Sequence, residues 1–116
     1  MLQAVTWNQV ETERLSDTIT RQMLNGDHTT VARIVLRQGA VVPRHHHPSE
    51  QLTMILEGTL LFTFDDREVT VRAGEMIFIP ANIPHAATAL EHCVDLDIFG
   101  PRREDWVTKD DAYLRG

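Results

Sequence analysis

Hydrophobic and polar positions alternate along the middle of this chain in short runs, a pattern typical of β-strands. Glycine, proline or aspartate closely follows each run, and such punctuation marks turns between strands. Strands at this close, regular spacing predict an all-β sandwich or barrel with few helices. The runs are Val31–Arg37, Gln51–Glu57, Thr59–Phe64, Glu68–Arg72, Met76–Ile79 and His92–Phe99.

The two ends of the chain lack this pattern. We expect residues 1–28 and 101–116 to form arms on one domain that spans residues 1–116, because 116 residues is the size of a single domain. The C-terminal arm carries Trp106 and Tyr113. Aromatic side chains bury large areas, so we expect both to pack on the barrel or on a second subunit.

The balance of acidic and basic residues argues against some classes of binding partner. Eleven basic and 17 acidic residues give a formal net charge of −6, which argues against a nucleic-acid footprint and against anionic membrane surfaces. No apolar run approaches the length of about 20 residues that spans a bilayer. Cys93 is the single cysteine and excludes an internal disulfide, so we expect a reducing, cytoplasmic location.

The candidate chemistry begins with three consecutive histidines. His45 and His47 share one face of an extended chain, and His46 points to the other. Gln51 follows after a turn, and His85 follows a proline-flanked loop. These side chains could chelate a divalent metal, whereas the competing interpretation is a solvated strip of surface histidines.

The spacing of these residues resembles the two signature motifs of the cupin family. The first motif is matched by Gly39, five residues, His45-x-His47, three residues, Gln51, six residues and Gly58; the second by Gly74, five residues, Pro80-x-Asn82, two residues and His85. Asn82 stands where the family has glycine, a mild change because asparagine tolerates left-handed turns. The resemblance spans about residues 30–100. It implies a double-stranded β-helix, or jelly-roll barrel, of two antiparallel sheets with a metal in its mouth.

The metal ligands that this resemblance implies are His45, His47, Gln51 and His85. Gln51 occupies the family's glutamate position, and Glu50 remains a rival ligand that breaks the spacing. Four neutral ligands leave the ion its full positive charge and make it a stronger Lewis acid. The expected cofactor is one divalent transition metal, with Ni, Zn, Mn and Fe all open, because ligand spacing alone does not select among them.

The last strand adds a second set of candidates. Asp97-x-Phe99-x-x-x-Arg103 is similar to the closing segment of the KdgF-type cupins of pectin degradation. That resemblance implies ring opening of 4,5-unsaturated uronates to a linear 5-keto-4-deoxyuronate. Asp97 would be the general acid/base, Arg103 would bind the substrate carboxylate, Phe99 would pack on the sugar, and Gln51 would contact metal and substrate. From alternation alone, the Asp97 face either lines a cavity or meets water.

Two other functions stay open at this point. One is a dioxygenase that uses iron, manganese or nickel at the same ligands, and the other is a non-catalytic sugar- or metal-binding module. The expected partner is a small acidic sugar. We also expect a homodimer, because Leu52, Met54 and Leu56 alternate away from Gln51 and leave an apolar outer face to cover.

Overall fold

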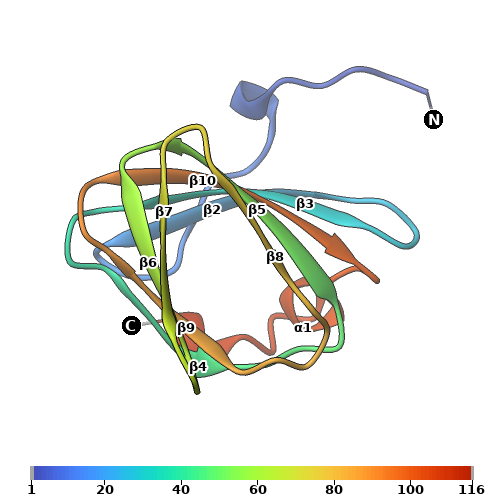
Figure 1. Ribbon diagram of the computed structural model, residues 1–116. Coiled ribbons are helices and arrows are strands. Elements are labelled where there is room, and N and C mark those ends of the chain that lie inside the picture. Colours follow the sequence, from blue (N-terminus) through green and yellow to red (C-terminus); the bar gives the residue numbers. More distant parts are fainter. Residues whose placement is uncertain (1, 116) are drawn as a thin grey trace.

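The computed structural model describes residues 2–115 and places ten strands in two antiparallel sheets that face each other (Figure 1). The larger sheet has the order β1-β2-β3-β10-β5-β8 and the smaller one β4-β9-β6-β7. The strands are β1 (Glu13–Arg14), β2 (Ile19–Asn25), β3 (Thr30–Leu36), β4 (Val41–His45), β5 (Glu50–Glu57), β6 (Thr59–Phe64), β7 (Glu68–Arg72), β8 (Met76–Ile79), β9 (His85–Ala89) and β10 (Cys93–Gly100). The predicted all-β barrel of two antiparallel sheets is therefore confirmed.

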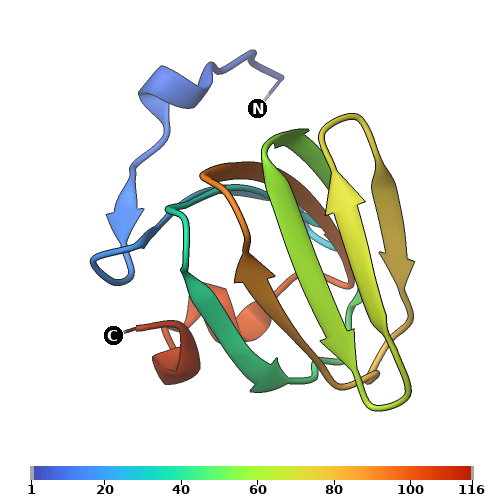
Figure 2. The ribbon, with the colours of Figure 1, turned by 60° about the vertical axis from the view of Figure 1, so that its left-hand side comes forward.

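Three short helical turns lie outside the sheets. They are η1 (Trp7–Gln9), α1 (Glu104–Val107) and η2 (Ala112–Leu114). Figure 2 shows η1 beyond the barrel, whereas the C-terminal segment lies beside β4. Among residues 2–115, no helix is long and apolar enough to cross a membrane.

Strand alternation sorts the side chains of the central strands between core and surface. On β10, Cys93, Asp95, Asp97 and Phe99 are all buried, so the acidic face predicted to be either wet or cavity-lining faces the barrel interior. On β5, Gln51, Thr53 and Ile55 face the same way, whereas Leu52 and Leu56 are exposed. The core between the sheets includes Leu36, Ile55, Leu60, Phe62, Val71 and Ile79.

The N-terminal region differs from the expected arm, because β1 and β2 are part of the larger sheet. All seven residues of β2 pair with β3. The sequence pattern hides this strand because Arg21, at an inward-facing position, is charged and yet 0% exposed.

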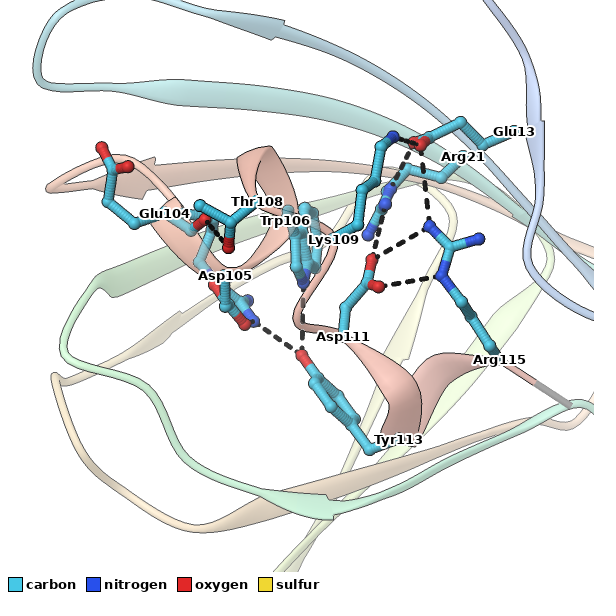
Figure 3. A network of polar contacts seen from close by, with 11 residues as sticks. Glu13, Arg21, Glu104, Asp105, Trp106, Thr108, Lys109, Asp111, Tyr113 and Arg115 are labelled. Carbon is cyan, nitrogen blue, oxygen red and sulfur yellow. Dashed lines mark hydrogen bonds and ion pairs between the residues drawn. The ribbon is translucent and has the colours of Figure 1, made fainter.

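Charge pairs explain how Arg21 is buried and why the C-terminal segment stays on the barrel (Figure 3). The Arg21 Nε donates to Glu13 at 2.9 Å and its Nη2 donates to Asp111 at 2.8 Å. Arg115 also donates to Asp111, at 2.8 Å. Since an unpaired buried charge is strongly unfavourable, these pairs tie the last residues of the chain to β1 and β2.

Candidate metal centre

The structure brings His45, His47 and His85 together at the mouth of the barrel. One ring nitrogen of each lies within 4.8 Å of the others. His45 ends β4, His85 begins β9, and the two residues are register partners in the smaller sheet. We call these three residues the histidine cluster. His46 is exposed and is not part of it.

A left-handed turn at Asn82 lies in the loop before His85 and is hydrogen-bonded to the loop that carries His47. Asn82 has φ = 62°, the conformation predicted from its place in the glycine position of the second motif. Its backbone N–H donates to the carbonyl of His47 at 2.8 Å. This bond connects the loop before His85 with the loop after His47, so the sequence change from glycine preserves the turn that assembles the site.

Backbone carbonyls fix the tautomer of all three histidines. The Nδ1 atoms of His45, His47 and His85 lie 2.7, 2.8 and 2.7 Å from carbonyl oxygens of Pro43, Ser49 and Ile83. A carbonyl only accepts hydrogen bonds, so each Nδ1 carries the proton and each Nε2 presents a lone pair. The buried Nε2 of His85 has no hydrogen-bond partner among the residues that the structure describes.

Burial keeps these imidazoles neutral, which is the form that binds metals. It lowers the pKa of His45 to about 3, with smaller contributions from the neighbouring histidines and Arg103. It lowers the pKa of His47 to about 4, with Arg103 as the second cause, and it also lowers the pKa of His85. At neutral pH the cluster therefore offers three uncharged nitrogen ligands.

Gln51 supplies a fourth candidate ligand from β5. Its Oε1 lies 3.1 Å from Nε2 of His47, and its side chain is buried, whereas Glu50 is exposed on the other face of the strand. Two lone pairs facing each other at this distance repel unless a cation joins them. Ligand atoms about 2.1 Å from one ion lie about 3.0–3.4 Å apart at ordinary coordination angles, so Gln51 and His47 have the spacing of two ligands of one divalent transition metal. The three imidazole nitrogens, within 4.8 Å of one another, could complete the set.

Two buried carboxyl groups on β10 lie near the candidate metal ligands. Asp95 and Asp97 are each 4% exposed. Burial, followed by repulsion from Asp97, raises the pKa of Asp95 well above its ordinary value. Burial raises the pKa of Asp97 to about 6, opposed by a hydrogen bond from Thr53 and the charge of Arg103. The two neighbouring carboxyl groups therefore resist being ionised together, which is a useful property for acid–base chemistry.

Arg103 lies beside the site, but its guanidinium is already paired. Its Nε and Nη2 donate to the two carboxylate oxygens of Asp105 at 2.9 and 2.8 Å. Its guanidinium carbon lies 4.9 Å from the ring centre of Phe99 and 4.2 Å from that of Trp106. Asp105 therefore occupies the planar fork that the sequence assigns to a substrate carboxylate, and Arg103 is only 2% exposed.

Tyr113 is a residue of the site that sequence reasoning did not place there. Its ring stacks on His45 with the centroids 4.7 Å apart, and its hydroxyl accepts hydrogen bonds from Arg103 at 2.6 Å and from Trp106 at 3.3 Å (Figure 3). The aromatic residues of the C-terminal segment thus pack on the barrel, one of the two outcomes expected for them. The only signal in the sequence was the presence of aromatic residues in a polar tail.

A narrow cavity connects these groups. Its volume is about 50 Å³, and its lining includes His45, Gln51, His85, Asp97, Arg103 and Tyr113. Pockets for drug-sized ligands enclose about 300–1,000 Å³. The cavity therefore has room for a few water molecules, and Arg103, Trp106 and Tyr113 of the C-terminal segment form part of its wall.

Comparisons with known proteins agree with this architecture. The family model described as "Cupin domain" matches residues 32–99. The uncharacterized protein YdbB of Bacillus subtilis is 39% identical over 68 residues, which cover 57% of this chain and 60% of that protein. The match thus spans less than two thirds of that relative's length.

Two solved structures are similar over most of the chain. An RmlC-like cupin from Shewanella frigidimarina is 27% identical with a TM-score of 0.82, covering 88% of this chain and 93% of that one. KdgF from Halomonas sp. is 22% identical with a TM-score of 0.79, covering 85% and 94%, a likeness that concerns the fold. With its barrel, its histidine cluster and a family match over more than half of its length, this chain belongs to the cupin family.

Proposed function

We propose that this cupin is a metal-dependent enzyme that moves a proton on a small acidic sugar, with 4,5-unsaturated uronates as the substrate class. The observation that carries the proposal is that Asp97 lines one cavity together with three of the candidate metal ligands, His45, Gln51 and His85. Asp97 is joined to Gln51 through Thr53 by hydrogen bonds of 2.6 and 2.8 Å. An acid–base group is thus held close to the position where a Lewis acid would bind.

We assign metal binding, proton transfer and the exclusion of water to different residues of the site. A divalent metal held by the histidine cluster and Gln51 would stabilise negative charge that develops on a sugar oxygen. Asp97 would accept the proton of a ring hydroxyl as the ring bond breaks, and a proton would return to the enol carbon. This is an isomerisation, so it needs no oxidant, reductant or second substrate. Phe99, which is 1% exposed, would exclude water from the reacting carbon.

The uronate part of the proposal is supported by Asp97, Phe99 and Arg103 in the spacing of KdgF-type cupins, and by the shared fold with KdgF. The Arg103–Asp105 pair adds a condition. Burial would raise the pKa of Asp105, but hydrogen bonds and charge from Arg103 outweigh burial and lower it. A substrate carboxylate would replace one anion by another on the same guanidinium, which preserves charge balance while the C-terminal segment opens.

The test is an assay of the metal-loaded protein on unsaturated galacturonate, followed by the loss of its ultraviolet absorbance. Asp97→Asn should retain the metal and lose at least about 100-fold in kcat, the usual size of a general acid–base contribution. Asp66→Asn, at an exposed aspartate, is the matched control and should leave kcat unchanged. A wild-type protein that binds metal and uronate without turnover would contradict the enzyme proposal and favour a binding module.

A further inference from the structure

A buried threonine links the metal-ligand set to the acidic pair. Thr53 is 0% exposed. Its hydroxyl lies between Gln51, which is on the same strand, β5, and Asp97, which is on the neighbouring strand, β10. The Nε2 of Gln51 donates to Thr53 Oγ1 at 2.8 Å, and Thr53 Oγ1 donates to Asp97 Oδ1 at 2.6 Å. Asp97 and Thr53 are register partners of β10 and β5, so the backbone sets this spacing.

The direction of these bonds decides which end of the Gln51 amide faces the histidine cluster. A carboxylate only accepts hydrogen bonds, so the single hydroxyl proton of Thr53 points to Asp97. The lone pairs of Thr53 can then only accept, and they require the NH₂ group of Gln51. The amide oxygen is consequently turned to the opposite side, 3.1 Å from Nε2 of His47.

This orientation is unfavourable for Gln51 when no cation is bound. An amide has nearly the same shape in both orientations, and the reversed one would let its NH₂ donate to the lone pair of His47. That reversal would satisfy both groups and would remove the oxygen ligand. Among the residues that the structure describes, the Thr53 hydroxyl, whose proton is already donated to Asp97, is the group that opposes the reversal through hydrogen bonding.

We propose that Thr53 is a positioning residue that keeps the amide oxygen of Gln51, rather than its nitrogen, directed at the histidine cluster. The inference rests on the proposed metal site and deepens it. Thr53 does not contact the metal or the substrate; it acts through Gln51. Groups that orient a metal ligand typically contribute about 10- to 100-fold to metal affinity.

The experiment measures Co²⁺ affinity at pH 8 by competition with a chelating dye, and the visible absorption of the bound ion. Thr53→Val removes the hydroxyl while keeping the side-chain shape, and we expect a loss of about 10-fold or more in affinity with an altered spectrum. Thr53→Ser keeps the hydroxyl and should stay within about 3-fold of wild type. Thr63→Val is the matched control, since Thr63 is an exposed strand residue.

A double-mutant cycle separates orientation from general damage. In the Gln51→Glu background the side chain presents an oxygen in either orientation, so adding Thr53→Val should change the affinity by less than about 3-fold. Equal losses in both backgrounds would overturn the proposal, and so would a Thr53→Val protein with wild-type affinity. A wild-type protein that binds no Co²⁺ would overturn the metal centre itself.

A measurement on the unaltered protein covers the case in which Thr53→Val does not fold. Nuclear Overhauser contacts of the Gln51 side-chain NH₂, recorded without metal and with Zn²⁺, report the amide orientation directly. The proposal expects contacts to Thr53 in both states. Contacts to the ring of His47 in the metal-free state would refute it.

Discussion

Replacing Asp97 by asparagine should stabilise the fold of the metal-free protein. The same change should remove the activity of the metal-loaded protein. The variant deletes a buried charge but keeps an oxygen that accepts the hydrogen bond from Thr53. Burial raises the pKa of Asp97 from 3.8 to about 6 in the folded chain. Each factor of ten in an acid dissociation constant is worth about 1.4 kcal/mol, so the ionised carboxylate destabilises the fold by about 3 kcal/mol.

The sign of the pH dependence follows from where the proton binds more tightly. The folded chain holds the Asp97 proton more tightly than the unfolded chain, so wild-type stability falls as the pH rises from 3.8 through about 6. The advantage of Asp97→Asn should therefore be about 3 kcal/mol at pH 8 and below about 1 kcal/mol near pH 4. Relief of the repulsion on Asp95 acts in the same direction.

Urea unfolding of the chelator-treated wild type and variant at both pH values measures this difference. Asp66→Asn, at an exposed site, controls for the loss of one negative charge. An Asp97→Asn protein that is no more stable than wild type at pH 8 would refute this prediction. The prediction is also refuted if the gain is the same at both pH values, because a charge-independent packing effect would then explain it.

Three further predictions concern the tail, the metal and the outer face. Asp111→Asn leaves the buried Arg21 with Glu13 as its remaining carboxylate partner and should destabilise the fold by about 1–3 kcal/mol in urea unfolding. A loss below about 0.5 kcal/mol, within the range of an exposed ion pair, would contradict this prediction. Zn²⁺ at about 100 times its Kd should stabilise wild type by about 2.7 kcal/mol, and His85→Ala should abolish that gain in thermal unfolding; an equal gain in both would place the metal elsewhere. Leu52, Phe78 and Met76 are 44, 53 and 71% exposed, so we expect sedimentation to show a dimer of the 13.2 kDa chain. Phe78→Asp should dissociate this dimer, and a wild-type monomer would exclude the interface.

Alternation and motif spacing predicted the parts of the site that lie on regular backbone. Gln51 and Thr53 share a face because the side-chain period of a strand is two, and Asn82 has the positive φ expected of a glycine substitute. The proximity of Thr53 to Gln51 could have been suspected from this alternation alone. The direction of its hydrogen bonds could not, because they depend on Asp97, which is 44 residues away.

The sequence pattern did not predict the ion pairs that involve residues on irregular backbone. Arg103 and Asp105 are two residues apart at the start of α1, and no periodicity indicates that their side chains meet. The strand β2 went unrecognised because Arg21 breaks its apolar face, and its partner Asp111 is 90 residues away. In a sequence, a buried charged residue whose partner is distant looks like a surface residue. Here the partner, Asp111, lies in the C-terminal segment that packs beside the site.

The proposed function requires one cation bound by three imidazoles and one amide. The most direct test is a crystal structure of the Ni²⁺-loaded protein with anomalous diffraction data collected at the nickel edge. We predict one anomalous peak, bonded to Nε2 of His45, His47 and His85 and to Oε1 of Gln51. A peak at other residues, a peak from which Gln51 is turned away, or no peak at saturating Ni²⁺ would contradict the account.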